Sequence, residues 1–168
     1  TGINIRLDWE GLTGRLPEGV RVIFYPKDTQ GRKIDTYLPA KGGEMKVPPG
    51  HYLAVIYNYD TEVVQVKGED SYETIMACTG NCTGLGDSET ENMVWGPDNF
   101  YVATLDDVEI GKGEELPTLE VRPKSVVTTY IFSIKTEGLK NVSSIIGSVS
   151  GMAECYHLGK GAGLCRFA

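Results

Sequence analysis

VPPGHYLAVIYNYD, residues 47–60, is the stretch that decides the fold of this chain. Two prolines and a glycine form a stiff turn at its start, and the polar residues 58–60 form a second turn at its end. Bulky apolar side chains lie between the turns on both alternating sets of positions: Tyr52, Ala54 and Ile56 on one face, and Leu53, Val55 and Tyr57 on the other. A strand that is apolar on both faces is typical of the middle of a structure. The stretch therefore predicts a central strand in a β scaffold.

Short strand patterns separated by turn signals cover most of the remaining chain. Residues 3–9 alternate between apolar and polar, which predicts a strand with one buried and one solvated face. Further strands are expected at residues 20–25, 34–38, 44–47, 62–66, 72–77, 99–105, 116–122, 125–136 and 142–151, and as a hairpin within 156–168. The 62–66 strand is expected to fold back on the central strand through the 58–60 turn. A short helix is the alternative for 142–151.

No helical pattern in the chain is longer than two turns, and turn-forming residues are frequent, with 21 glycines and 8 prolines. Many short strands with turns between them indicate an all-β fold, specifically a β-sandwich with little helix. The length of 168 residues fits a single domain spanning 1–168, or one domain of a longer protein.

Acidic residues dominate the charge: 23 against 16 lysines and arginines, for a net charge of −7. Phosphate backbones and anionic membrane surfaces repel such a chain, so nucleic acid is not expected as a partner. No apolar run approaches the roughly 18 residues that a membrane-spanning helix needs.

Four cysteines, Cys78, Cys82, Cys155 and Cys165, are candidates for disulfide bonds. Their spacing matches no common zinc signature, so no metal is expected, and an even number in a glycine-rich β chain favours two disulfides over four free thiols. Three pairings are open. We expect the local one, 78–82 with 155–165, because residues 79–81 can turn tightly; each bridge would contribute about 2–3 kcal/mol, against about 4–5 kcal/mol for long-range pairing.

The sequence assigns no catalytic residue and no cofactor. His51 lies at the start of the central strand, where packing at the strand entrance explains it. His157 lies two residues from Cys155, which suggests a Cys/His nucleophile, but no third orienting residue is evident and Cys155 is expected in a disulfide. The glycine-rich segment 159–163 lacks the residue order of a phosphate-binding loop. An enzyme is therefore not expected.

Residues 79–98, TGNCTGLGDSETENMVWGPD, form the longest irregular segment, here called the 79–98 loop. A loop of this length in a compact domain is usually functional or mobile. Its acidic residues lack the spacing of a calcium-binding loop, which favours a solvated acidic surface. Trp95, Phe100 and Tyr101 flank its acidic part and form a candidate binding surface for a sugar ring or a partner; packing in the core is the alternative.

Four segments, in their order, resemble the fimbrillin-like, fimbrial-anchor lipoproteins of Bacteroidales: VRVIFYP at 20–26, LPAKGGEMKVPPGHYLAVIYNYDTE at 38–62, PDNFYVATLDDV at 97–108 and GLKNVSSIIGSVSGMA at 138–153. The resemblance implies a β-sandwich of transthyretin-like topology and Greek-key type. It also implies export, a lipid anchor on the outer membrane, and a role as an anchoring, accessory or tip subunit of surface fimbriae. The family has no catalytic residues, and its lipid-bearing cysteine is not in this chain. Because family precursors are usually longer, we expect an N-terminal domain or a short variant.

Two functional hypotheses follow. The first is a non-enzymatic surface subunit of a fimbria-like assembly, whose partners are other fimbrial subunits or surface proteins and which assembles by β-strand addition. In that case the strand at 3–9 is expected to be an edge or exchangeable strand. The second is a binding module that displays the 79–98 loop to a glycan or a host protein.

Overall fold

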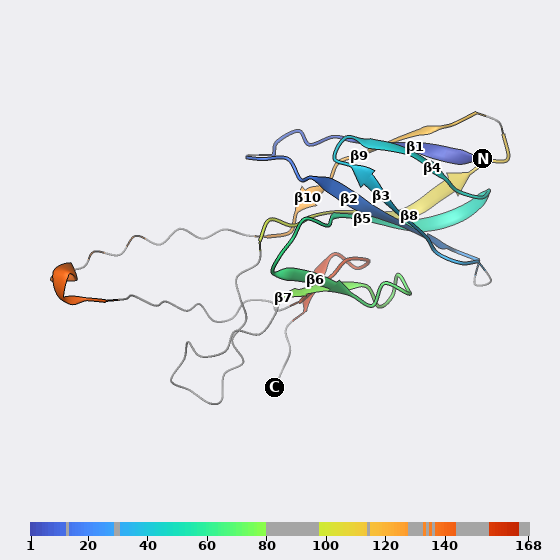
Figure 1. The fold of residues 1–168 in the computed structure, drawn as a ribbon. Coiled ribbons are helices and arrows are strands. Elements are labelled where there is room, and N and C mark those ends of the chain that lie inside the picture. Colours follow the sequence, from blue (N-terminus) through green and yellow to red (C-terminus); the bar gives the residue numbers. More distant parts are fainter. Residues whose placement is uncertain are drawn as a thin grey trace.

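The structure is a computed structural model that describes residues 1–12, 14–28, 31–79, 98–113, 115–127, 133, 135, 137–143 and 155–164. Its strands form three sheets that are stacked as layers (Figure 1). The three-stranded sheet has the order β4 (Gly42–Lys46), β1 (Gly2–Leu7), β9 (Thr118–Val121). The five-stranded sheet has the order β10 (Lys124–Ser125), β8 (Tyr101–Ile110), β5 (Gly50–Asn58), β2 (Gly19–Pro26), β3 (Ile34–Pro39). The four-stranded sheet has the order β12 (Ala162–Leu164), β11 (Cys155–His157), β7 (Met76–Thr79), β6 (Val64–Lys67).

The five-stranded sheet is the middle layer, with β5 at its centre (Figure 1). Tyr52, Ala54 and Ile56 are buried in the first core, against the three-stranded sheet. Val55 and Tyr57 are buried in the second core, against the four-stranded sheet. The prediction of a central, two-faced strand in an all-β sandwich is therefore confirmed. A 3-10 turn, η1 (Leu139–Asn141), is the one helical element among the described residues, and none of them forms a helix long and apolar enough to cross a membrane.

Strand β1 buries the face that its sequence predicts but occupies a different place from the expected one. Ile3, Ile5 and Leu7 are 3%, 1% and 7% exposed. The strand is central in its sheet, antiparallel to β4 and parallel to β9. The prediction of an edge strand at residues 3–9 is therefore wrong. Alternation of apolar residues reports which face is buried, whereas the neighbours of a strand depend on segments distant in the sequence.

The predicted hairpin between the central strand and residues 62–66 is also wrong. Strand β6 belongs to a different sheet from β5 and pairs with β7. Both neighbours of β5 are already provided by β2 and β8, so the chain leaves the middle layer after Asn58. Val64 then packs into the second core from the other side.

The remaining predicted strands are found with shifted bounds. Strand β7 begins at Met76 instead of residue 72, because the N–H groups of Thr74 and Ile75 bond to the carbonyl of Ser71 in a preceding turn. The tail hairpin is confirmed, since β11 and β12 pair antiparallel around a turn that contains Gly161 at φ +64°. Of the 125–136 segment, the structure assigns Ser125 to a strand, and most of 142–151 lies outside the described residues.

Gly42 lies where β4 passes close to the backbone of β1 in the three-stranded sheet. Its φ is +96°, in the region that favours glycine. A Cβ atom at this position would lie 1.9 Å from the carbonyl oxygen of Ile5. Glycine is therefore required where β4 begins beside β1.

Candidate functional site

Both ends of the 79–98 loop are held at the same strand. Thr79, the last residue of β7, lies opposite Val64 of β6. The carboxylate of Asp98 accepts hydrogen bonds from the N–H groups of Glu62, Val63 and Val64, at 2.6, 3.3 and 3.0 Å. Residues 80–97 lie outside the described residues, but their two flanking residues therefore meet at the start of β6.

The surroundings of Asp98 favour the ionised form of its carboxyl group. Partial burial acts to raise the pKa of its carboxyl, but the N–H groups of Glu62, Val64 and Val63 outweigh burial and hold the pKa below its usual value. The negative charge is therefore retained at neutral pH. This carboxylate joins the turn before β6 to the end of the loop.

Asn58 fixes the chain just after the loop. Its side chain is 3% exposed, and its Oδ1 accepts the N–H of Tyr101 at 2.8 Å. Its Nδ2 donates to the carbonyl of Asn99 at 3.1 Å and to Asp60 Oδ1 at 2.8 Å. A buried amide with its polar atoms bonded makes a rigid base for the loop. The polar residue that ends the apolar stretch 52–57 is the sequence signal that could have identified it.

Two of the three aromatic residues proposed for binding are buried, so they do not form an exposed binding surface. Phe100 is 2% exposed and packs in the second core, with its ring 5.9 Å from that of Tyr57. Tyr101 is 7% exposed and meets Trp9 edge-on at 5.6 Å. The alternative of core packing is therefore correct for both. Trp95 lies outside the described residues.

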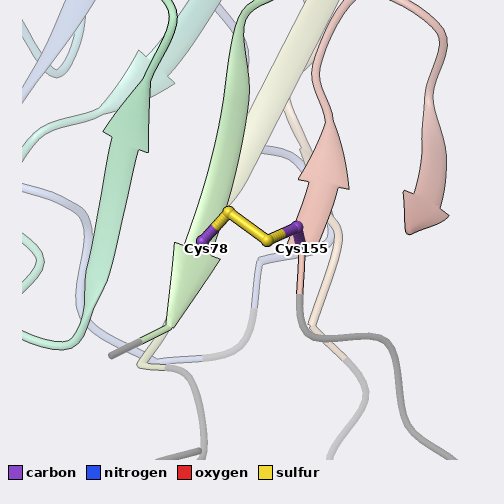
Figure 2. Close-up of a disulfide and its surroundings, with 2 residues drawn as sticks. All are labelled: Cys78 and Cys155. Atoms are coloured by element: carbon purple, nitrogen blue, oxygen red, sulfur yellow. A yellow bond between two sulfur atoms is a disulfide. The ribbon is translucent and has the colours of Figure 1, made fainter. Parts of the chain in front are cut away.

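A disulfide joins Cys78 of β7 to Cys155 of β11 (Figure 2). The two residues face each other in the register of the antiparallel strands, with Cα atoms 4.2 Å apart. The expectation of local pairing between Cys78 and Cys82, and between Cys155 and Cys165, is therefore wrong. Facing positions on neighbouring strands bring two cysteines together without a tight turn, whatever their separation in sequence. Cys82 and Cys165 lie outside the described residues.

The two histidines lie in different surroundings. His51 is exposed at the start of β5. His157 is 5% exposed; its Nδ1 accepts the N–H of Lys160 at 2.8 Å, which leaves Nε2 to donate to the carbonyl of Glu73 at 2.6 Å. With both ring nitrogens bonded and the neighbouring Cys155 in a disulfide, His157 supports the tail hairpin. Within the described ranges, no three His, Cys, Asp or Glu side chains are grouped as a metal site.

Arg21 organises a polar cluster that sequence reasoning missed. Its guanidinium donates through Nε to Asp35 Oδ1 at 2.8 Å and through Nη2 to the other oxygen of the same carboxylate. It also donates to Tyr57 Oη at 2.9 Å and pairs with Glu69 at 3.3 Å. The bonds to Asp35 raise the pKa of Arg21, and burial raises the pKa of Tyr57 to about 12 although Arg21 opposes that shift. The cluster is held in place from β2, β3, β5 and the chain after β6.

Comparison with known proteins agrees with this scaffold. A protein from Bacteroides ovatus, "Putative fimbrium anchoring subunit Fim4B", is 54% identical over 165 residues, which are 98% of this chain and 50% of that protein. A crystal structure described as a "putative adhesin" from the same species aligns with a TM-score of 0.87 at 54% identity, covering 98% of this chain and 58% of that one. The chain thus spans 50% and 58% of the length of these two relatives.

A more distant likeness concerns the fold alone. A crystal structure from Bacteroides thetaiotaomicron, described as "putative polysaccharide binding proteins (DUF1812)", aligns with a TM-score of 0.54 at 9% identity, over 74% of this chain and 47% of that one. The resemblance to Bacteroidales fimbrial-anchor proteins is confirmed by the closer matches. Since one family model matches residues 1–166, the chain belongs to the family described as a domain of unknown function, DUF5119.

Proposed function

We propose that this chain is a non-enzymatic, cell-surface subunit that anchors or supports a fimbria-like assembly. The observation that carries the proposal is the 54% identity, over 98% of the chain, to the relative named as a fimbrium anchoring subunit. The name of the crystal structure at the same identity, an adhesin, supports the same class of function. The partners would be other fimbrial subunits or surface proteins, and the location would be outside the cell, at the outer membrane.

The described residues support a scaffold. Two cores share one middle sheet, and the polar side chains that are most buried, Asn58 and His157, are bonded to backbone groups nearby. A disulfide supports export, because such bonds persist in oxidising compartments. These features stabilise the fold, so any contact with a partner would be made by residues at the surface.

Assembly by strand addition remains part of the proposal, but β1 cannot be the open edge because it has a neighbour on each side. The longest edge strands among those described are β3, with six residues, and β4, with five. An added strand would bond to the backbone of one of them. Short edge strands are poor acceptors because they offer few unpaired groups.

Amide hydrogen exchange on the chain bound to a neighbouring fimbrial subunit tests this function. We expect the subunits to co-purify and the amides of β3 or β4 to gain protection in the complex. Protection confined to loops would contradict strand addition while leaving the anchoring role intact. A strain that lacks this chain and still retains its fimbriae on the cell surface would contradict the anchoring role itself.

The second candidate function is display of the 79–98 loop to a glycan or host protein. It is supported by the base of the loop, where Thr79, Asp98 and Asn58 are fixed by the contacts described above. A rigid base with a long excursion is a common arrangement for binding loops. A glycan array probed with the wild type and with Trp95→Ala should show signals that the substitution removes; signals unchanged by Trp95→Ala would contradict this use of the loop.

A further inference from the structure

Two tyrosines lie exposed side by side on the middle sheet, near its β3 edge. Tyr37 of β3 is 62% exposed and Tyr59, just after β5, is 44% exposed. Their rings meet edge to face, with centroids 5.2 Å apart. We call this pair, with its acidic neighbours Glu18 and Asp60, the tyrosine surface. Large exposed aromatic side chains that lie together often mark an interaction site.

The two rings are held in position by their surroundings. Tyr37 lies opposite Arg21 in the register of β2 and β3, and the guanidinium carbon is 5.7 Å from its ring centroid. Arg21 is itself fixed by Asp35 and Glu69. The Tyr59 ring covers Gly19, where a Cβ atom would lie 2.7 Å from its hydroxyl oxygen. Rings that are fixed before binding lose little conformational entropy when a partner arrives.

The border of the tyrosine surface carries negative charge with no counter-ion. Asp60 accepts the N–H of Glu18 at 3.1 Å and the Nδ2 of Asn58 at 2.8 Å, both from uncharged donors. Neither Glu18 nor Asp60 forms an ion pair with a described residue. By contrast, the carboxylates of Asp35 and Glu69 both form ion pairs with Arg21. Two aromatic rings beside two uncompensated carboxylates therefore attract positive charge.

We propose that the tyrosine surface binds a lysine or arginine side chain on a segment of a partner protein. A cation over a tyrosine ring and within reach of a carboxylate repeats, between two chains, the arrangement that Arg21 makes with Tyr37 and Asp35 inside this one. Tyrosine and arginine are also enriched, with tryptophan, among the residues that contribute most to binding energy in protein interfaces. The inference goes beyond the proposed function, since binding would use exposed side chains and neither the backbone groups of a strand edge nor the 79–98 loop.

Titration of the ¹⁵N-labelled protein with a blocked peptide of sequence Gly-Arg-Gly-Arg-Gly tests the proposal by nuclear magnetic resonance. We expect amide shifts concentrated at residues 18–19, 36–38 and 59–60, and none with the same peptide carrying uncharged citrulline in place of arginine. Tyr37→Ala and Tyr59→Ala should each weaken binding about two- to fivefold, the range for an exposed cation–π contact. Glu18→Gln should also weaken binding of the peptide. Leu116→Ala, at another exposed apolar residue, should leave binding unchanged.

Three outcomes would overturn the proposal. One is absence of binding. Another is shifts spread over the acidic surface and unchanged in the Tyr37→Ala/Tyr59→Ala double variant, which would show non-specific attraction to a chain of net charge −7. The third is a response of the same amides to an uncharged oligosaccharide such as maltohexaose but not to the arginine peptide, which would make this a sugar site. Because both tyrosines are exposed, circular dichroism of the variants should match that of the wild type.

Discussion

Removal of the Cys78–Cys155 bond should destabilise the protein strongly. The bonded residues are 77 positions apart in sequence. Closing a loop of that length lowers the conformational entropy of the unfolded chain by about 15 cal/mol/K. At 25 °C this raises the free energy of the unfolded state by about 4.5 kcal/mol. The free energy of unfolding of a domain is typically about 5–15 kcal/mol, so this one bond accounts for a large share of it. Alanine is a suitable replacement for both cysteines because the side chains are small and at least half-buried.

Urea unfolding followed by circular dichroism measures the effect in a Cys78→Ala/Cys155→Ala variant. For an m-value of about 2 kcal/mol/M, the midpoint should fall by about 2 M. A reducing agent should lower the wild-type midpoint to a similar value and leave that of the variant almost unchanged. A midpoint in the variant within experimental error of the oxidised wild type would refute the reasoning.

Cys82→Ala is the matched control, because this substitution would prevent a Cys78–Cys82 bond but would leave the Cys78–Cys155 bond intact. In this variant, tryptic peptides 68–112 and 141–160 should remain joined until reductant is added, since each then holds one cysteine of the pair. Separation of the two peptides without reductant would show that Cys78 is not bonded to Cys155.

Three more substitutions test other parts of the structure. Gly42→Ala should cost at least about 2 kcal/mol, from the positive φ and the clash with the Ile5 carbonyl; the same change at Gly111, where a Cβ would have open space, should alter the melting temperature little. The lowered pKa of Asp98 means that its carboxylate stabilises the fold above its unfolded pKa of about 4 and that this stability is lost as pH falls through the lower folded value. Asp98→Asn should therefore lower the melting temperature at pH 7 and flatten its decline between pH 5 and 2; a decline as steep as that of the wild type would contradict this role. Phe100→Ala should cost about 3–5 kcal/mol in urea unfolding, and a loss below 1 kcal/mol would mean that the ring is exposed.

Local sequence patterns predicted the faces of the strands well. The apolar residues on both sides of β5 correctly predicted a strand between two packed layers, and the alternation in β1 correctly predicted Ile3, Ile5 and Leu7 as buried. Glycines around residue 160 correctly predicted the tail hairpin. These features depend on residues close in sequence, where period and turn chemistry are informative.

Neighbour relations could not be predicted in the same way. The parallel partner of β1 is β9, more than a hundred residues away, and the partner of Cys78 is 77 positions away. Nothing in the pattern of either segment specifies its partner. The sequence therefore predicts the nearest cysteine as the partner of Cys78, and an edge position for the strand at residues 3–9. Phe100 and Tyr101 illustrate a related difficulty, because an aromatic residue next to a polar loop has the same sequence pattern whether it points outward or into a core.

The shared position of β5 between two cores limits how the sequence of this protein can vary. Adjacent residues such as Ala54 and Val55 belong to different cores, and both are fully buried. A change of volume at either one must be compensated by repacking against a different outer sheet. Strands at the surface can accumulate neutral substitutions on their solvated face, but residues 52–58 of β5 have no such face. These residues should therefore diverge most slowly among related chains, and they offer a short signature by which remote members of the family can be sought.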